Sequence, residues 1–285
     1  MKHNMGRKVF NHIIRKITRK MGFEVIRYKE PDAKESGLPL DFDESTTCIF
    51  RTIEKYTMTS PERVYALIEA TRYIAKNRIE GAMVECGVWR GGSAMAMALA
   101  LLEIGDFERD IYLYDTFCGM TAPSRVDISI SGRPAQEKFS QLRISDDSSD
   151  WCFCPLEGVR DNLRSTGYPK DRFHFVKGKV ENTIPGNVPE KIALLRLDTD
   201  WYGSSRHELV HLYPRLSSGG VLIIDDYGQW QGVKKAVDEY MSEIGLHILL
   251  NRIDYTGRIT VKPHYREGGM LGKGDLLGGG DVFYD

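Results

Sequence analysis

Apolar runs of strand length alternate with helix-length segments from about residue 82 onward. The expected strands are Ala82–Cys86, Ile111–Tyr114, Phe173–Lys177, Ala193–Leu197 and Val221–Ile224, followed by an antiparallel pair at Ile248–Asn251 and Ile259–Lys262. Ser93–Leu102 is typical of a buried helix, and Gly232–Ile244 of an amphipathic one. Strands that alternate with helices indicate a parallel sheet covered on both faces. The pattern therefore predicts an α/β fold with a doubly wound, mostly parallel sheet of seven strands.

The N-terminal segment has a different pattern. Apolar residues recur at helical spacing from Met5 to Met21, and seven Lys and Arg precede the first acid, Glu24. Residues 1–22 are therefore expected to form a basic amphipathic helix. Such a helix suits an anionic membrane surface, a transit peptide, or packing on its own domain or on a second subunit. The segment lacks the apolar stretch of a signal peptide, so secretion is not expected.

Turn residues and helix signals divide the chain into three expected regions. These are an N-terminal helix and connector over 1–55, a main domain over 56–265 and a glycine-rich tail over 266–285. Residues 29–50 are polar and turn-rich, which indicates a connector, whereas Thr59-Ser60-Pro61-Glu62 is a helix start. The long interruption at about 119–165 is typical of a lid or a binding loop.

Composition excludes several functional classes. Hydrophobic residues make up 41% of the chain and charged residues 28%, as in ordinary globular proteins. The net charge of −1 lacks the basic excess of a nucleic-acid-binding protein. The five cysteines are scattered without metal-ligand spacing, which indicates reduced thiols in a cytoplasmic protein. No apolar run approaches the roughly 18 residues that span a bilayer.

Two expected strands end in pairs of carboxylates. Asp198 and Asp200 follow one apolar run, and Asp225 and Asp226 follow the next. The carboxyl ends of parallel strands meet at one edge of a sheet, which brings the four side chains together. Clustered carboxylates repel each other unless a cation lies among them, and oxygen ligands suit Mg²⁺, Mn²⁺ or Ca²⁺. The sequence therefore predicts a divalent-metal site.

A glycine turn follows the first strand. Gly87, Gly91 and Gly92 let the backbone approach a ligand closely, although the spacing is neither that of a dinucleotide fingerprint nor that of a P-loop. Glu85 precedes the turn, where a carboxylate would repel a pyrophosphate but suits a cationic sulfonium amino acid. Asp115 ends the next strand, where an acid suits ribose hydroxyls. Together these residues favour S-adenosylmethionine over NAD.

Four motifs carry a resemblance to a known family. They are Glu85-x-Gly87-Val88-Trp89-Arg90-Gly91-Gly92, Tyr114-Asp115-Thr116-Phe117-x-Gly119, Arg196-Leu197-Asp198-x-Asp200-x-Tyr202 and Gly219-Gly220-x5-Asp225-Asp226-Tyr227. Over roughly residues 55–255 the chain resembles the macrocin O-methyltransferases, which methylate sugar hydroxyls. The resemblance implies a class I methyltransferase (Rossmann-like) fold with a helical lid. It also implies S-adenosylmethionine and Mg²⁺ (or Mn²⁺) as cofactors, and a homodimer.

The resemblance also implies roles for individual residues. Asp198, Asp225 and Asp226 would be the metal ligands, and Asp200 the general base. The residues that would line the cofactor are Thr57, Met58, Arg63, Glu85, Gly87, Ser93, Asp115, Thr116, Lys179, Val180 and Glu181. The 119–165 segment differs from the family and would choose the acceptor, a small glycosylated molecule.

Several alternatives remain open from the sequence. The Asp198-x-Asp200 spacing also occurs in metal-dependent phosphatases and in glycosyltransferases. A methyltransferase-like scaffold without catalysis, held at a membrane by residues 1–22, is another class. His207 or His211 is a second choice of base. The acceptor is a glycosylated metabolite such as an antibiotic, a surface-polysaccharide sugar or a catechol-like phenol, and the sequence does not choose among them.

Overall fold

The computed structural model describes residues 37–264 of the 285-residue chain. The chain divides into two units, residues 1–42 and 43–285, and every helix and strand named below belongs to the second. The expected basic helix over 1–22 and the glycine-rich tail over 266–285 lie outside the described residues. Within residues 37–264, no helix is both long enough and apolar enough to cross a membrane.

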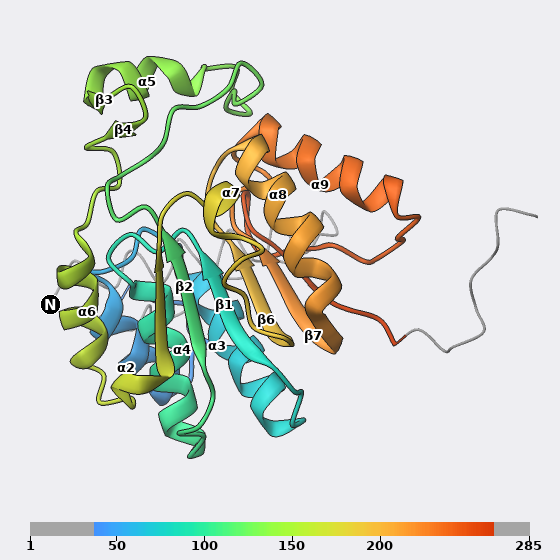
Figure 1. The fold of residues 1–285 in the computed structure, drawn as a ribbon. Coiled ribbons are helices and arrows are strands. Elements are labelled where there is room, and N and C mark those ends of the chain that lie inside the picture. The colour runs from blue at the N-terminus through green and yellow to red at the C-terminus, as the bar shows by residue number, and fades with distance from the viewer. Residues whose placement is uncertain (1–36, 265–285) are drawn as a thin grey trace, which may run out of the picture. The chain divides into compact units, whose positions relative to one another are not determined.

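A seven-stranded sheet in the order β5-β2-β1-β6-β7-β9-β8 forms the centre of this unit (Figure 1). The strands are β1 (Ala82–Cys86), β2 (Ile111–Asp115), β5 (Phe173–Lys177), β6 (Ile192–Leu197), β7 (Leu216–Ile224), β8 (Asn251–Arg252) and β9 (Arg258–Val261). The first five pair in parallel, and β9 is antiparallel to both β7 and β8. The expected doubly wound, mostly parallel sheet is confirmed. Its order reverses between β1 and β6, where open α/β sheets bind ligands.

Helices cover both faces of the sheet (Figure 1). On one face lie α2 (Glu44–Ile53), α3 (Pro61–Lys76), α4 (Gly92–Ile104) and α6 (Leu156–Arg164), and on the other α7 (Val180–Thr183), α8 (Tyr202–Leu212) and α9 (Gln231–Glu243). Two short 3-10 helices, η1 (Lys170–Arg172) and η2 (Tyr213–Arg215), precede β5 and β7. A hydrophobic core lies on each face of the sheet, the first beneath α2, α3, α4 and α6 and the second beneath α7, α8 and α9. Because side chains alternate along a strand, Met83 and Leu194 pack in the first core, whereas Val84 and Leu195 pack in the second.

The expected connector over 29–50 is wrong at its C-terminal end. Helix α2 begins at Glu44, and the Asp43 side chain caps it by accepting a hydrogen bond from the Thr46 amide. Ile49 and Ile53 lie one turn apart on its buried face and join the first core. Most other residues of this short helix are polar, which hid the apolar stripe, so a tertiary contact decides the helix.

Two strand boundaries also differ from expectation. β7 begins at Leu216 rather than Val221. Ser217-Ser218-Gly219-Gly220 resembles a turn in sequence, but in the structure it is an irregular part of the strand, where Gly219 N donates to Lys262 O at 2.9 Å. β8 contains only Asn251–Arg252, so Ile248–Leu250 lie outside the strand. The predicted start of α3 is confirmed, with Ser60 as its cap.

The predicted insertion projects beyond the carboxyl ends of the strands (Figure 1). It contains α5 (Ala135–Leu142) and a small hairpin of β3 (Arg143–Ser145) and β4 (Ser148–Ser149). We call residues 119–155 the lid. Its base is fixed to the domain because Ile130 N donates to Gln229 O at 2.8 Å and Tyr202 N donates to the Asp127 carboxylate at 2.8 Å.

Candidate active site

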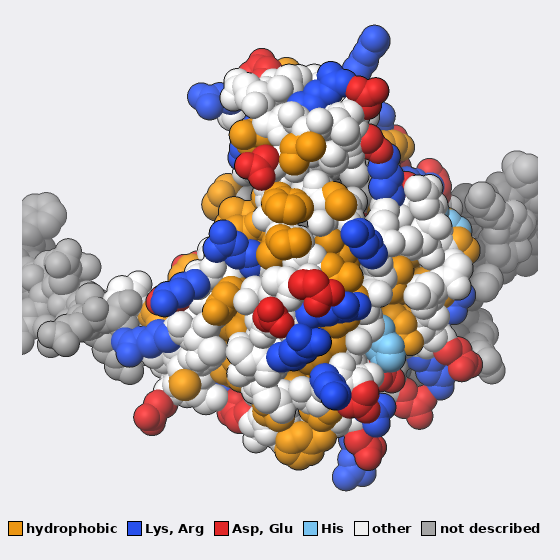
Figure 2. Space-filling view, turned by 60° about the vertical axis from the view of Figure 1, so that its left-hand side comes forward, with side chains coloured by type: hydrophobic (Ala, Val, Ile, Leu, Met, Phe, Trp, Pro, Cys, Tyr) orange, Lys and Arg blue, Asp and Glu red, His pale blue; other side chains and the backbone are white. Residues whose placement is uncertain are grey.

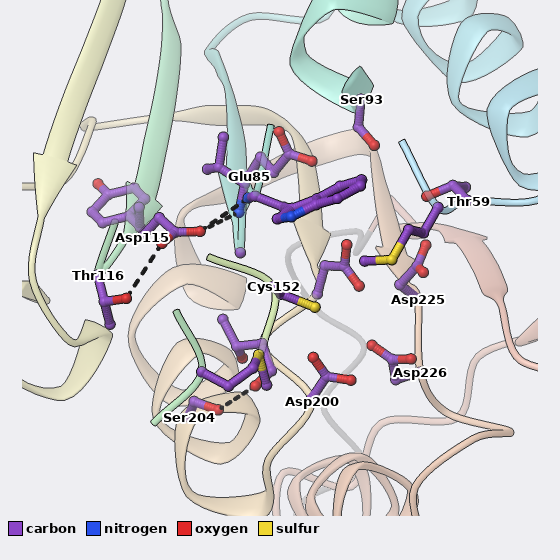
Figure 3. Close-up of a pocket in the computed structure, with 18 of the residues that line it drawn as sticks. Thr59, Glu85, Ser93, Asp115, Thr116, Cys152, Asp200, Ser204, Asp225 and Asp226 are labelled. Carbon is purple, nitrogen blue, oxygen red and sulfur yellow. Dashed lines mark hydrogen bonds between the residues drawn. The ribbon is translucent and has the colours of Figure 1, made fainter. Parts of the chain in front are cut away.

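A cavity of about 490 Å³ opens at the carboxyl ends of β1, β2, β6 and β7 (Figure 3). All of the residues predicted for the cofactor, the metal and catalysis line it: Thr57, Met58, Arg63, Glu85, Gly87, Ser93, Asp115, Thr116, Lys179, Val180, Asp198, Asp200, Asp225 and Asp226. Glu181 also lines it. The topology therefore brings together residues from four strand ends and from the lid. The volume of the cavity is within the range of small-molecule binding sites.

The glycine turn is held close to its neighbours. Gly87 has φ +85°, and a Cβ placed there would lie 2.0 Å from the Asp198 carbonyl oxygen. A Cβ at Gly92 would lie 2.5 Å from the Tyr56 carbonyl oxygen. Glycine is required at both positions because the backbones of β1 and β6 and of α4 and the 56–59 loop nearly touch. Ser93 follows in the first turn of α4 and faces the cavity.

Asp115 organises this turn. Its Oδ2 accepts hydrogen bonds from Val88 N at 2.7 Å and Trp89 N at 3.1 Å, and its Oδ1 accepts one from Phe117 N at 2.6 Å. Burial raises the pKa of the Asp115 carboxyl, although these amides oppose the rise. Thr116 Oγ1 also approaches Oδ1, at 3.5 Å (Figure 3). Asp115 thus fixes the loop, and its predicted contact with ribose stays a prediction.

A buried arginine that sequence reasoning did not assign to the site lies beneath it. Arg196 is 1% exposed and donates to Glu85 Oε1 at 2.8 Å, to Asp198 Oδ2 at 2.7 Å and to Asp225 Oδ1 at 2.7 Å. Its one visible signal was a charge inside the apolar β6 run. Burial raises the pKa of Glu85 to about 8, with Arg196 opposing the rise. Arg196 therefore offsets part of the negative charge of three acids at once.

Arg63 supplies a second positive charge. Its guanidinium pairs with Asp225, and its Nε lies 3.0 Å from Asp254 Oδ2. Asp254 in turn accepts a hydrogen bond from Ser60, the cap of α3, at 2.8 Å. These contacts place Asp225 between Arg63 and Arg196, so the Asp225 carboxylate is held in one orientation.

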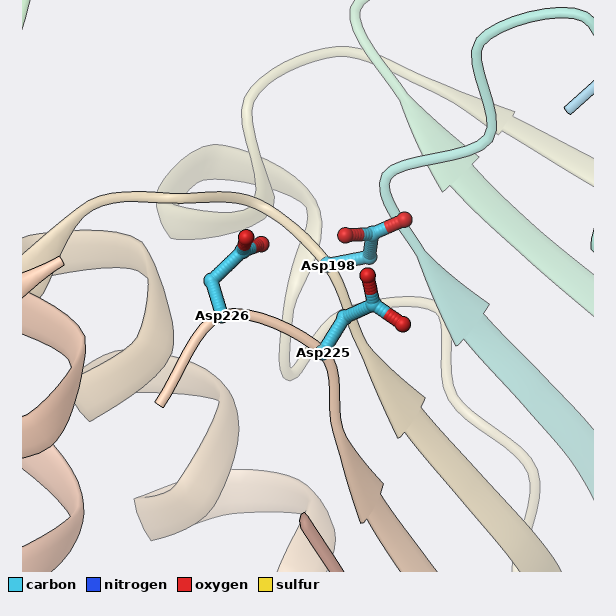
Figure 4. Close-up of side chains that lie close together, drawn as sticks. All are labelled: Asp198, Asp225 and Asp226. Carbon is cyan, nitrogen blue, oxygen red and sulfur yellow. The ribbon is translucent and has the colours of Figure 1, made fainter. Parts of the chain in front are cut away.

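Three carboxylates form the candidate metal centre. Asp198, Asp225 and Asp226 each offer an oxygen, and these oxygens lie within 4.8 Å of one another (Figure 4). Within the described residues, Asp226 Oδ2 is buried without a hydrogen-bond partner. Burial, and then the neighbouring Asp200, Asp198 and Asp225, raise the pKa of Asp226 well above its ordinary value. Oxygen ligands at this spacing fit a hard divalent cation, which would remove the repulsion.

Asp200 lies beside this centre in a constrained backbone. Its φ is +67°, a left-handed conformation that costs a non-glycine residue free energy. Trp230 Nε1 donates to Asp200 Oδ1 at 2.7 Å. Burial and the Asp198 charge raise the pKa of Asp200 to about 7, near the range in which a carboxylate exchanges protons at neutral pH. Asp200 and Asp226 point into the same space (Figure 3).

The rival base from the sequence is wrong. Neither His207 nor His211 lines the cavity. The His207 ring nitrogen Nε2 is 2.9 Å from the Ile184 carbonyl oxygen, and the two histidine rings pack at 4.4 Å. His207 therefore contacts the end of α7 and not the cavity.

The lid supplies the wall opposite the glycine turn. Trp151 and Cys152 line the cavity, and Lys138 Nζ lies 4.2 Å from the centre of the Trp151 ring. Asp147 at the tip of the β3–β4 hairpin pairs with Lys179, a predicted cofactor residue. Hydrophobic side chains also gather on the surface just below the lid (Figure 2). The lid therefore contributes side chains to the cavity and also a contact to Lys179, one of the residues predicted for the cofactor.

Comparison with known proteins gives a consistent result. The profile of the macrocin O-methyltransferase family matches residues 5–262. The chain is 33% identical over 202 residues to 8-demethyl-8-(2,3-dimethoxy-alpha-L-rhamnosyl)-tetracenomycin-C 4'-O-methyltransferase of Streptomyces olivaceus, covering 71% of this chain and 74% of that protein. It is 30% identical over 208 residues to demethyldecarbamoylnovobiocin O-methyltransferase of Streptomyces niveus, covering 71% and 74%.

Solved structures agree at the level of the fold. The O-methyltransferase NovP superposes with a TM-score of 0.65 at 28% identity, covering 73% of this chain and 83% of NovP. A calicheamicin methyltransferase superposes with a TM-score of 0.51 at 16% identity, covering 82% of this chain and 99% of that one, which is a likeness of fold alone.

Proposed function

This chain belongs to the macrocin O-methyltransferase family and is an S-adenosylmethionine-dependent O-methyltransferase, and from that premise we propose its acceptor, its metal and its base. The acceptor is a sugar hydroxyl of a glycosylated small molecule. A divalent cation, Mg²⁺ or Mn²⁺, is bound by Asp198, Asp225 and Asp226, and Asp200 takes the proton. We call Asp198, Asp225 and Asp226 the acid trio. The observation that carries the proposal is that the acid trio, Asp200 and the glycine turn share one cavity.

The cofactor end of the cavity follows from the fold. The glycine turn and Asp115 lie where a class I methyltransferase sheet reverses its strand order. Glu85 keeps one buried oxygen, Oε2, without a hydrogen-bond partner among the described residues, although Arg196 occupies the other. That oxygen can accept a hydrogen bond from the ammonium group of S-adenosylmethionine, and a carboxylate there would also attract the sulfonium charge.

The acid trio fits a hard cation for a physical reason. Two arginines already neutralise Asp225, yet Asp226 keeps a buried oxygen without a partner among the described residues. A bound divalent cation would lower the pKa of an oxygen that it coordinates and orient that oxygen. Asp198, Asp225 and Asp226 would hold the cation, and Arg63 and Arg196 would hold Asp225 in place.

The proton balance of the reaction falls to Asp200. Attack of the acceptor oxygen forms a new C–O bond as the S–C bond of the donor breaks, leaving S-adenosylhomocysteine and a methyl ether. The hydroxyl proton passes to an Asp200 carboxylate oxygen. Trp230 donates to Oδ1 and thereby leaves Oδ2 available for the acceptor. General-base catalysis of this kind contributes about 10²–10⁴-fold in rate.

Two exposed apolar side chains at the cavity support a proposal about the group attached to the sugar. Met58 is 63% exposed and Tyr255 is 62% exposed, and both line the cavity near its rim. Large exposed apolar side chains beside a binding site commonly mark a contact surface. An apolar aglycone attached to the methylated sugar would cover them. The acceptors named for the relatives, such as a rhamnosylated tetracenomycin, are of this kind.

Methyl transfer to a panel of glycosylated acceptors tests the proposal. With a labelled methyl donor, we expect transfer in the presence of Mg²⁺ and its loss with a chelator. Asp200→Asn should lower turnover by about 10²–10⁴-fold, the contribution of a general base, and leave calorimetric binding of S-adenosylmethionine unchanged. Near-normal turnover of Asp200→Asn would remove Asp200 as the base. Full activity after chelation, with no Mg²⁺ binding by calorimetry, would show that the proposed metal site is wrong.

A further inference from the structure

The turn that carries Asp200 is held from behind by an acid outside the cavity. Glu208 lies in α8, is 0% exposed and does not line the cavity. Thr199 Oγ1 donates a hydrogen bond to Glu208 Oε1 at 2.9 Å. Within the described residues, Glu208 Oε2 has no hydrogen-bond partner. A buried carboxyl in this state is costly to keep, and the chemical step assigned to Asp200 does not use it.

The environment of Glu208 disfavours the charged form of its carboxyl. Burial raises its pKa well above the ordinary value, and the nearby acids Glu181 and Asp198 raise it further, while Thr199 opposes them. The described structure gives Glu208 no arginine or lysine partner. A neutral carboxyl still accepts a hydrogen bond through its carbonyl oxygen. Glu208 therefore serves Thr199 as a hydrogen-bond acceptor.

The Thr199 turn needs such support because it is strained. Asp200 adopts φ +67°, and Trp201 N donates back to Thr199 O at 2.9 Å, which closes a tight turn. Ser204 Oγ adds a contact to Thr199 O at 3.5 Å (Figure 3). Among these contacts, the hydrogen bond to Glu208 is the one made by the Thr199 side chain. Strained backbone persists only where its surroundings hold it.

We propose that Glu208 is a positioning residue for methyl transfer, which holds Asp200 at the acceptor through the hydrogen bond from Thr199. This inference rests on the proposed role of Asp200 as the base. Asp200 is held from two sides, by Trp230 at its carboxylate and by Glu208 through the neighbouring side chain. Release of one restraint moves the carboxylate without emptying the cofactor half of the cavity.

Three variants separate positioning from folding. Thr199→Val removes the donor at nearly constant volume, Glu208→Met removes the acceptor at similar length, and Glu208→Gln keeps a carbonyl acceptor without the carboxyl. We expect Thr199→Val and Glu208→Met each to lower kcat by about 100-fold, the effect of a misplacement of about 1 Å. KM for the acceptor and the Kd for S-adenosylmethionine should stay within about twofold of wild type. Glu208→Gln should restore kcat to within about threefold of wild type.

The double variant Thr199→Val with Glu208→Met gives the sharpest control. If the two residues act through one hydrogen bond, the double variant has the kcat of either single variant. Multiplied losses, a wild-type kcat in Thr199→Val, or a Glu208→Gln as slow as Glu208→Met would each overturn the inference. If Glu208→Met does not fold, Thr199→Val and Glu208→Gln decide the question.

Asp200→Asn distinguishes this inference from the proposed function. If Asp200→Asn loses turnover while Thr199→Val keeps it, the base assignment stands and the positioning role of Glu208 fails. If Asp200→Asn keeps turnover, the base assignment itself fails, whatever the Glu208 variants do.

Discussion

At the scale of single residues, the site holds several acidic side chains and two arginines close together in one cavity. Arg196 and Arg63 neutralise the acids nearest the sheet, while Asp226 keeps an oxygen without a partner among the described residues. Asp198 and Asp200 have pKa values raised to about 6 and about 7, chiefly because the protein shields them from water. The metal-free fold therefore bears an electrostatic strain that a cation would relieve.

That strain predicts a pH dependence of stability without metal. Asp200 holds its proton up to about pH 7 when folded, but an unfolded aspartate loses it near 3.8. The folded chain then binds more protons than the unfolded chain between these values, so the free energy of unfolding falls as pH rises through this window. Thermal unfolding in chelator should show a lower Tm at pH 8 than at pH 5. Added Mg²⁺ should raise the Tm more at pH 8 than at pH 5.

Asp226→Asn should stabilise the metal-free protein. The amide removes one of the mutually repelling carboxylates, and about 1 kcal/mol of relief corresponds to about 2–4 °C in Tm for a domain of this size. We expect this gain in chelator at pH 8, with no further rise on adding Mg²⁺. A lower Tm than wild type in chelator, or an undiminished Mg²⁺ response, would contradict the account.

Sequence reasoning found the residues that face the cavity more completely than those behind it. Asp198, Asp200, Asp225 and Asp226 end apolar runs, so their place at a strand end was visible. Arg196 pairs with Glu85, which is 111 residues away along the chain, and no local pattern encodes such a contact.

At the scale of elements, the β1–α4 turn and the end of β6 depend on each other. Gly87 packs against the Asp198 carbonyl, and Asp198 N donates to Cys86 O at 2.8 Å. The glycine turn and the end of β6, which carries Asp198, thus pack directly against each other. Element types were predictable here because the periodicity is strong, whereas α2 and the start of β7 depend on burial that their polar sequences conceal.

Substitution of Gly87 by Ala tests this contact between the glycine turn and β6, with Gly167→Ala as the matched control. Both glycines have a left-handed φ, +85° and +79°, but a Cβ at Gly167 meets nothing within 4 Å. The control should lose about 1–2 kcal/mol from backbone conformation alone. Gly87→Ala should lose at least about 2 kcal/mol more through the collision with Asp198. Urea unfolding measures both, and equal losses would show that the close approach is not required.

At the scale of the whole molecule, the sheet places a cofactor end and an acceptor end in one cavity, and the lid closes one wall of it. The lid contributes Trp151, whose ring centre lies 6.2 Å from that of Trp230, and also Asp147, which pairs with Lys179. Its sequence position was visible as a break in the alternation of strands and helices. Its contacts were not, because they join residues on separate elements. If the lid chooses the acceptor, as the family resemblance implies, that choice depends on the part of the chain where sequence patterns are weakest.

Calorimetric titration of S-adenosylmethionine into the full-length protein measures whether the cavity binds the methyl donor. We predict micromolar binding at one site per chain, with no binding of NAD. Glu85→Gln should weaken the binding by about tenfold or more, as expected for the loss of a buried charge partner, while Asp226→Asn leaves it unchanged. Thermal unfolding of each variant shows that it is folded. The absence of S-adenosylmethionine binding to the folded wild-type protein would contradict the account.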